Sequence, residues 1–370
     1  MRWTERTWPL ALLALGVTGL LASVALNAVV LAPNRLLTGH GYVSIALPAL
    51  RWLPLAWLVV LATARMRGMA GLVVAMLLLP ALLVATGFAA NGLLATAGGH
   101  ARVQLGSGFW CMATSAVLLV ADRQREIRMR ASLRLACWIG LAMLVVAMTA
   151  AGMFDRLSIV QEFVLQRARF LTAVGQHLLL AFSATAAAVV LGAPLAVAVA
   201  QRRRGRGISL AVLNLVQTIP SMALFALLVA PLAWLGVGGT GNAPALVALT
   251  AYALLPVMRY TLAGLATAPS SALDAARGLG LQPWQVLTRV QLPLGLPVFA
   301  AGLRIVLVQS IGLAAVAALV GAGGLGRFVF LGLGQGANDL VMLGTLAIIA
   351  LALAADGACR ALERWMEPHA

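Results

Sequence analysis

The chain has 370 residues, of which 62% are apolar and 10% charged, and its formal net charge at pH 7 is +16. Soluble domains carry about 25% charged residues, so this composition cannot cover a water-facing surface and indicates an integral membrane protein. All 26 basic residues are arginine, which excludes a P-loop ATPase, a pyridoxal-phosphate Schiff base and a kinase-type lysine within this chain.

Ten stretches are apolar enough to cross a membrane, because a spanning helix needs about 20 largely apolar residues. The stretch at 43–64 is the weakest, since Arg51, Pro48 and Pro54 interrupt it. We therefore expect an all-α membrane protein with about ten transmembrane helices. They lie approximately at 9–31, 43–64, 69–90, 103–121, 133–152, 178–200, 208–230, 243–264, 295–320 and 338–358.

The arginines alternate in density between successive connections of these spans. Because membrane proteins concentrate arginine on the cytoplasmic side, this pattern predicts that both termini are cytoplasmic. It also favours membrane orientation over nucleic-acid binding as the reason for the positive charge. The denser connections hold Arg2, Arg6, Arg65, Arg67, Arg123, Arg125, Arg128, Arg130, Arg134, Arg202, Arg203, Arg204, Arg206, Arg277, Arg289, Arg360 and Arg364.

A polar segment divides the ten spans into two groups of five. Residues 155–176 carry charged side chains among apolar ones at helical spacing, which is typical of an amphipathic helix on a membrane surface. We expect an N-terminal accessory domain over 1–152, an amphipathic periplasmic linker over 153–177 and a second membrane domain over 178–370. The N-terminal half contains no motif with recognisable chemistry.

The connection between the eighth and ninth spans has strong local signals. Ser271 and Asp274 have the spacing of a capping box, which predicts the start of a short helix. Gly280 can adopt the left-handed conformation that ends a helix. Pro283 suits the first turn of a second short helix, and Pro293 is expected to stop it. The predicted structure is helix, turn, helix on the cytoplasmic face, a shape that a partner can hold.

The same connection, residues 265–294, resembles the EAA loop of permeases in bacterial binding-protein-dependent ABC importers. The family pattern is Glu-Ala-Ala, three residues, Gly, nine residues, Ile-x-Leu-Pro; this chain has Asp274 for the glutamate and Val290 for the isoleucine. The resemblance implies that the loop contains the coupling helix that docks on a cytoplasmic ATPase subunit. The matching residues are Asp274, Ala275, Ala276, Gly280, Val290, Leu292 and Pro293.

The likeness extends over roughly residues 172–365. The stretches at 217–221, 252–259 and 319–326 are similar to permeases for osmoprotectants, and the N-terminal half resembles the extra helices of the longer permease in the low-affinity glycine-betaine uptake system of enterobacteria. Methionine-importer permeases share the EAA loop and a five-span core, and fit these other stretches less well. The resemblance implies a type I ABC importer permease core in the C-terminal half.

Two stretches are candidates for the translocation pathway and its gate. Pro220 should kink the seventh span and expose a polar stretch, although it is also explained as a proline that the membrane tolerates. The glycine-rich segment formally matches the dinucleotide motif GxGxxG, but it follows a membrane span rather than a strand, so a close-approach turn near the outer gate is favoured. The candidates are Gln217, Thr218, Pro220, Ser221, Gly321, Gly323, Gly324 and Gly326.

The remaining polar residues give no metal pattern. The cysteines fall singly in or beside apolar runs, and the histidines are scattered and expected at interfaces or tails. Arg259 and Arg304 lie near membrane depth, where they should snorkel or pair. The cysteines are Cys111, Cys137 and Cys359, and the histidines are His40, His100, His177 and His369.

The resemblance implies the permease subunit of an ATP-driven importer for glycine betaine or related quaternary amines, in the bacterial inner membrane. ATP and magnesium would bind a separate ATPase subunit, so this chain would hold no cofactor or metal and catalyse no reaction. The other partners would be a periplasmic binding protein, a second permease subunit in a homo- or heterodimer, and membrane lipid, but no nucleic acid. An aromatic cage for the quaternary amine is expected in the binding protein, since the chain has only three tyrosines.

Two alternatives stay open. The first is an importer permease for an amino acid such as methionine. The second is an ion-coupled secondary transporter, a class that normally uses carboxylates inside the membrane and inverted repeats. Only Asp356 and Asp339 lie in or near a span, and no internal repeat is evident. A membrane-embedded enzyme is not favoured, because the chain has no cluster of histidine, lysine or carboxylate side chains.

Overall fold

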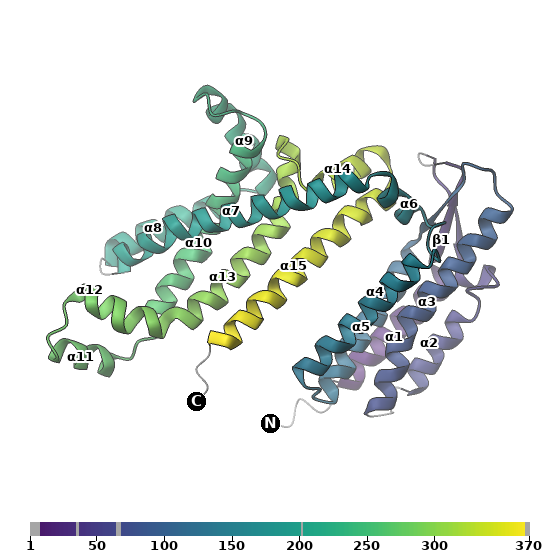
Figure 1. Cartoon of the computed structure of the whole chain (residues 1–370), viewed down its shortest axis with the longest axis horizontal. Coiled ribbons are helices and arrows are strands. Elements are labelled where there is room, and N and C mark those ends of the chain that lie inside the picture. The colour runs from purple at the N-terminus through teal and green to yellow at the C-terminus, as the bar shows by residue number, and fades with distance from the viewer. Residues whose placement is uncertain (1–7, 35–36, 64–67, 201–202, 367–370) are drawn as a thin grey trace. The chain divides into compact units, whose positions relative to one another are not determined.

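The chain forms two compact units, which Figure 1 shows in a computed structural model describing residues 8–34, 37–63, 68–200 and 203–366. The first unit comprises Met1–Leu165 with Gln335–Asp339, and the second comprises Gln166–Gly334 with Leu340–Ala370. Part of the orientation argument falls outside the described residues, namely Arg2, Arg6, Arg65, Arg67 and Arg202.

The first unit is a helical bundle capped by a small sheet. Its interior is apolar, with Trp57, Leu72 and Met112 almost fully buried. This unit has its own hydrophobic core, which is what an independent domain requires. Its helices are α1 (Trp8–Ala25), α2 (Leu53–Ala62), α3 (Met69–Ala95), α4 (Ser107–Glu126), α5 (Ala131–Ala150) and α6 (Ser158–Leu165), with a short 3-10 turn at Ser44–Ala46.

Three short strands depart from the expectation of helix alone. Strand β1 (Asn27–Ala32) lies between β2 (His40–Val43) and β3 (Arg102–Leu105), antiparallel to both. The first and fourth stretches, expected as helices over 9–31 and 103–121, were therefore wrong at these ends. The sequence of β1, Asn-Ala-Val-Val-Leu-Ala, contains β-branched residues that favour strands, and an apolar run does not distinguish a strand from a helix end.

The second unit is built around α10 (Asn242–Leu265), which packs against α7 (Arg167–Ala200) and α13 (Leu292–Ala314). Small side chains allow these helices to approach closely: Ala181, Ala184 and Ala188 of α7 are fully buried. The other elements are α8 (Arg203–Thr218), α9 (Ser221–Trp234), α11 (Ser270–Gly278), α12 (Pro283–Val286), a π-helical turn (Leu287–Gln291), a 3-10 turn (Val316–Val320), α14 (Gly326–Gln335) and α15 (Asn338–Met366).

The expected count of ten spans is approximate. In the described part of the chain, six helical stretches are long and apolar enough to cross a membrane, and a seventh is counted if α8 and α9 form one span bent by 101°. The stretch at 43–64 contains only the ten-residue α2, and α1 is also short for a span. The six stretches are Met69–Ala95, Ala131–Ala150, Arg167–Ala200, Asn242–Leu265, Pro283–Ala314 and Asn338–Trp365.

The polar segment between the two groups of spans is not one helix. Residues Ser158–Leu165 form α6, and Arg167 begins α7, which continues without a break to Ala200. The first three turns of α7 therefore belong to the same long helix as the apolar residues that follow. The change from the first unit to the second falls between Leu165 and Gln166.

A buried ion pair holds the first unit together where β3, α6 and the start of α15 meet. The Arg102 guanidinium donates a 2.7 Å hydrogen bond to the Glu162 carboxylate, whose side chain is only 2% exposed. The carboxylate of Asp339, also buried, lies against Ser158 and the backbone of Leu105. A carboxylate buried this deeply is costly without its cationic partner.

We therefore expect Arg102→Met to destabilise the protein by about 3–5 kcal/mol, because the buried Glu162 carboxylate would lose its ion pair with Arg102. Thermal unfolding of the purified full-length protein measures this effect. Arg156→Met removes an exposed arginine nearby in the chain and should change the unfolding temperature little. The double variant Arg102→Met/Glu162→Leu should recover much of the loss, and equal destabilisation by Arg102→Met and Arg156→Met would contradict this account.

Candidate functional site: an exposed loop and a broken helix

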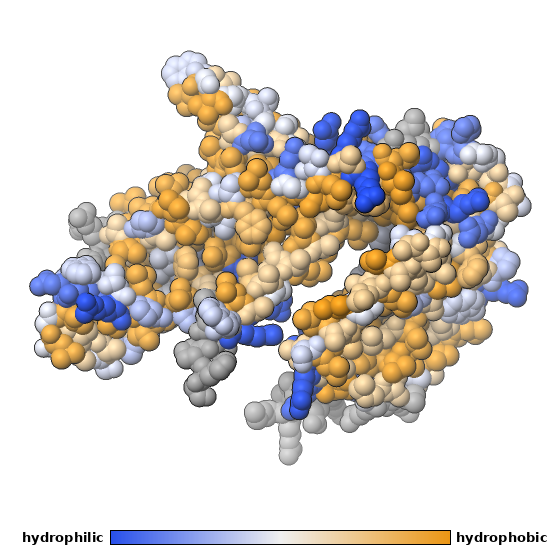
Figure 2. All heavy atoms as spheres, viewed as in Figure 1, coloured by the Kyte–Doolittle hydropathy of each residue, from blue (hydrophilic) through white to orange (hydrophobic). Residues whose placement is uncertain are grey.

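The loop between α10 and α13 forms a projecting tip at one end of the second unit (Figure 1). Figure 2 shows hydrophilic side chains at this tip and hydrophobic ones over the helices that lead to it. Two large apolar side chains are nevertheless exposed here, Leu279 by 82% and Trp284 by 62%. Exposed apolar side chains rimmed by polar ones are typical of a surface that binds another protein.

Gly280 makes the turn of this tip. Its φ is +77°, in the left-handed region that favours glycine. The Leu281 N–H donates to the Ala276 carbonyl at 3.1 Å, and the Gly280 N–H donates to the Arg277 carbonyl at 2.9 Å, so the last turn of α11 closes on itself before the chain reverses. The prediction that Gly280 ends the first short helix is confirmed.

The predicted start of α11 was wrong. The helix begins at Ser270, one residue before the expected capping serine; Pro269 precedes it in an extended conformation, and no side chain caps the first turn. Asp274 instead pairs with Arg277 at 3.2 Å on the exposed surface. A capping box does occur at α12, where Gln282 and Gln285 bond reciprocally before and after Pro283.

Pro293 does not stop the second short helix, contrary to expectation. The chain continues from α12 through the π-helical turn into α13, and the Leu292 N–H donates to Leu287, five residues back. A π-helical turn accommodates an irregular step without ending the helix. The loop is thus joined to α13 by continuous helix from Pro283 to Ala314.

The seven residues of the EAA-like pattern are spread along this path. Asp274, Ala275 and Ala276 lie in α11, and Gly280 lies in the turn. The remaining three, Val290, Leu292 and Pro293, lie at the junction of the π-helical turn with α13. Helix α11 contacts both α12 and the π-helical turn, so the tip and the base of the loop form one packed element.

The seventh predicted span is broken rather than kinked. Helices α8 and α9 meet at an angle of 101° across Ile219 and Pro220, because Pro220 has no N–H to continue the helix. The break is bonded to α10: the Gln217 amide donates to the Tyr252 carbonyl at 2.8 Å, and the Tyr252 hydroxyl donates to the Ile219 carbonyl. Thr218 bonds within its own helix to Leu215 at 2.7 Å, and Ser221 begins α9.

The glycine-rich segment connects the 3-10 turn to α14 at the end of the second unit away from α11 and α12 (Figure 1). Gly321, Gly323 and Gly324 have φ between +77° and +84°, so three nearby glycines make the reversal. Gly326 is different: a Cβ there would overlap the carbonyl of Ala315. The prediction of a turn where two backbones approach closely is confirmed in geometry.

Two residues of α7 whose role the sequence analysis missed bond to this segment and to the neighbouring helix α13. The Gln176 side chain accepts the Gly324 N–H at 3.2 Å. His177, expected at an interface, is fully buried, and its Nε2 lies 2.9 Å from the Ile311 carbonyl; because a carbonyl only accepts, Nε2 carries the proton. The adjacent polar pair Gln-His at the start of an apolar run was the one available signal.

The two arginines near membrane depth are both paired. Arg259 of α10 donates to the Asn214 side chain of α8 at 2.7 Å. Arg304 of α13 lies 3.4 Å from Asp356 and 3.1 Å from Glu363, both on α15. These polar contacts join neighbouring helices and give each arginine a partner. With the pair of Asp274 and Arg277 in the loop, each of the three carboxylates Asp274, Asp356 and Glu363 has an arginine partner.

Two family descriptions match the chain. Residues 188–368 match the binding-protein-dependent transport system inner membrane component, and residues 6–160 match the N-terminal domain of the ABC transporter permease YehY. The glycine betaine/carnitine/choline transport system permease protein OpuCB of Bacillus subtilis is 32% identical over 194 residues, which are 52% of this chain and 87% of that protein. The osmoprotectant import permease protein OsmW of Salmonella typhimurium is 35% identical over 208 residues, which are 56% of this chain and 96% of that protein.

The fold of the second unit is also found in solved structures. The methionine ABC transporter MetNI in an inward-facing conformation aligns with a TM-score of 0.51 at 23% identity, over 54% of this chain and 97% of the matched chain. This similarity concerns the fold alone. The relatives, the loop and the core together place the chain in the family of ABC importer permeases to which the osmoprotectant permeases belong.

Proposed function

We propose that this chain is the transmembrane permease subunit of an ATP-driven importer for glycine betaine or related quaternary-amine osmoprotectants. The observation that carries the proposal is the match over the second unit to permeases whose names give glycine betaine, carnitine and choline as substrates. The exposed loop with the Asp-Ala-Ala and glycine pattern supports the same assignment, because it supplies a tip for an ATPase to hold.

The proposed partners follow from what the chain lacks and what it exposes. It has no lysine for a nucleotide-binding loop, so ATP and magnesium would bind a separate cytoplasmic ATPase. Closure of the ATPase would move the loop and switch the translocation pathway between inward-facing and outward-facing states. A periplasmic binding protein would deliver substrate, and a second permease would complete the pathway. The loop and both termini would face the cytoplasm of a bacterial inner membrane.

The proposal assigns different roles to the parts of the chain. Residues 178–370 would form the permease domain and 1–152 the accessory domain; the expected linker 153–177 comprises α6 in the first unit and the first turns of α7, which continue into the permease domain. Coupling to the ATPase would use Asp274, Ala275, Ala276, Gly280, Val290, Leu292 and Pro293. The pathway and gate would use the broken helix around Pro220 and the glycines of the segment 321–326, with Tyr252 of α10 fixing the break.

Uptake into proteoliposomes tests the proposal. The permease is reconstituted with its ATPase, its binding protein and internal ATP, and labelled glycine betaine, choline and methionine are compared. We expect ATP-dependent uptake of glycine betaine or choline, with no competition from excess methionine. If only methionine were taken up, the proposed substrate class would be wrong and an amino-acid importer would be indicated. Uptake driven by a proton or sodium gradient without the ATPase would instead indicate an ion-coupled secondary transporter.

A further inference from the structure

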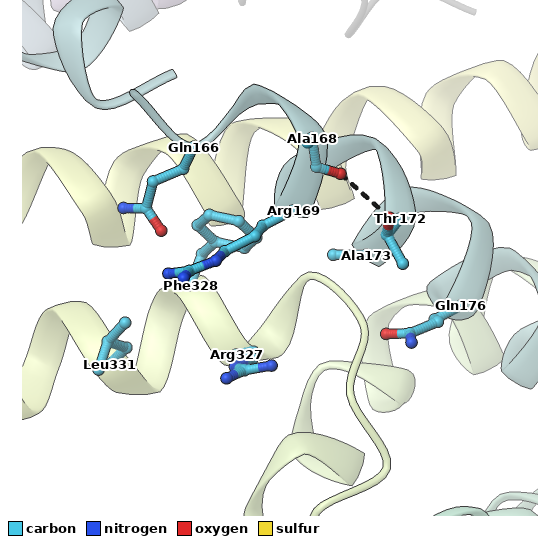
Figure 3. A pocket seen from close by; sticks show the side chains of 9 residues that line it. All are labelled: Gln166, Ala168, Arg169, Thr172, Ala173, Gln176, Arg327, Phe328 and Leu331. Carbon is cyan, nitrogen blue, oxygen red and sulfur yellow. Dashed lines mark hydrogen bonds between the residues drawn. The ribbon is translucent and has the colours of Figure 1, made fainter. Parts of the chain in front are cut away.

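A cavity of about 270 Å³ lies between the start of α7 and α14, within the second unit (Figure 3). Arg169 of α7 and Arg327 of α14 line it from the two helices, together with polar Thr172 and Gln176. Phe328 and Leu331 of α14 provide an apolar wall. Both arginines are exposed to solvent, and two guanidinium groups that line one small cavity make it attractive to an anion.

The second unit supplies no acidic side chain for these arginines among its described residues. Its acids in that range are Asp274, Asp356 and Glu363, and each is paired with an arginine of the loop, α13 or α15. Neither Arg169 nor Arg327 makes an ion pair among the described residues. The positive dipole end of α14, whose second residue is Arg327, adds to the attraction for an anion.

The length of α7, taken with the proposed orientation, places the cavity near the lipid headgroups. Helix α7 has 34 residues, so it is about 51 Å long, whereas the hydrocarbon core of a bilayer is about 30 Å thick. An arginine-rich segment follows its end at Ala200, which places that end at the cytoplasmic surface. Residues 167–177, which bear the cavity, then emerge at the outer surface; this step rests on the orientation in the proposed function.

The charge of the cavity decides which ligand it suits. Choline is a cation and is repelled by two guanidinium groups, and zwitterionic glycine betaine would bring its quaternary ammonium group beside the same arginines together with its carboxylate, so both are disfavoured. The zwitterionic headgroup of phosphatidylethanolamine brings an ammonium group beside the same arginines, and is disfavoured for the same reason. A phosphate diester without a cation pairs well with arginine, and its acyl chains can lie against Phe328 and Leu331.

We propose that this cavity binds the phosphate group of an anionic phospholipid of the outer leaflet, with Arg169 and Arg327 as its ligands. The lipid would bridge α7 and α14, which also hold the glycine-rich segment between them through Gln176. A bound headgroup would thus stabilise the outer end of the permease domain from its lipid side. The acidic surface of a periplasmic protein is the competing occupant, and the experiment separates the two.

Native mass spectrometry of the purified full-length chain, delipidated and then mixed with phosphatidylglycerol or phosphatidylethanolamine, measures lipid binding. Wild type should retain phosphatidylglycerol preferentially, and Arg169→Gln/Arg327→Gln should bind it about 30-fold more weakly, about fivefold for each arginine. Arg167→Gln is the matched control, because this arginine is exposed on the same helix, about 200° around its axis from Arg169, and should bind lipid normally.

Further arms identify the source of the phosphate. Excess inorganic phosphate should not displace the lipid, because it has no acyl chains for the apolar wall; displacement that depends on both arginines would overturn the lipid assignment. Unchanged lipid binding in the double variant would also overturn it, and unchanged lipid binding with weaker association of the binding protein would identify a protein-docking site instead. If the double variant elutes as aggregate, Arg169→Gln alone decides, with about a fivefold loss expected. Lipid retention needs neither ATP nor substrate, so failure to transport quaternary amines would leave this test valid.

Discussion

Gly280→Val is expected to abolish uptake and substrate-stimulated ATP hydrolysis while leaving the amount of membrane-inserted protein unchanged. The turn of the loop holds Gly280 at φ +77°, where a β-branched residue costs about 1–2 kcal/mol or more. No other atom lies within 4 Å of a Cβ at this position, so the strain comes from the backbone alone. We expect the chain to relieve this strain by moving the tip, which would carry Leu279 and Trp284 away from the proposed docking position.

Gly278→Ala is the matched control for this prediction. Gly278 lies two residues earlier, at the end of α11, with equally open space around its Cβ and no positive φ. Alanine there should leave transport unchanged, or stabilise α11 slightly, by about 0.5–1 kcal/mol. Immunoblotting of membranes controls for abundance, and labelled glycine betaine uptake in cells reports function. Wild-type transport by Gly280→Val at normal abundance would remove the loop from the coupling role.

The loop shows which parts of the site could be predicted from sequence. The glycine turn and the proline start of α12 depend on backbone conformations that one residue type determines, so Gly280 and Pro283 were placed correctly. The start of α11 and the continuation of helix past Pro293 depend on the conformation of several neighbouring residues rather than on one residue type. Helix α11 starts directly after the extended Pro269 rather than at a serine cap, and the π-helical turn continues the chain where Pro293 was expected to stop it.

In the helical core, prediction from the sequence was limited by contacts between segments that lie far apart in the chain. Pro220 predicted a kink from local chemistry, but the 101° break depends on bonds from Gln217 and Tyr252, residues 35 positions apart in the chain. His177 and Gln176 were overlooked because their partners, Ile311 and Gly324, lie more than 130 positions away. In the first unit, β1 was missed because apolar composition is shared by strands and membrane helices, whereas β2 and β3 have only four residues each, too few for a periodic pattern.

Gly326→Ala is expected to be the most damaging single methyl addition in the glycine-rich segment. A Cβ at Gly326 would overlap the backbone carbonyl of Ala315, and a carbonyl in a packed turn cannot rotate away as a side chain can. Overpacking of this kind costs about 1–3 kcal/mol, and the rigid partner favours the upper end. The start of α14 would shift from the end of α13, so we expect a lower unfolding temperature and little or no transport.

Gly334→Ala provides the control within the same helix, since Gly334 lies near the end of α14 with open space around its Cβ and no positive φ. It should unfold and transport like wild type. Fluorescence-detected thermal unfolding and uptake are measured together for both variants, because the two readouts separate packing from gating. If Gly326→Ala unfolds at the wild-type temperature yet fails to transport, the close approach at Ala315 serves gate movement rather than stability. If it is normal in both, α14 does not depend on this contact, and the assignment of Gly326 to the gate is wrong.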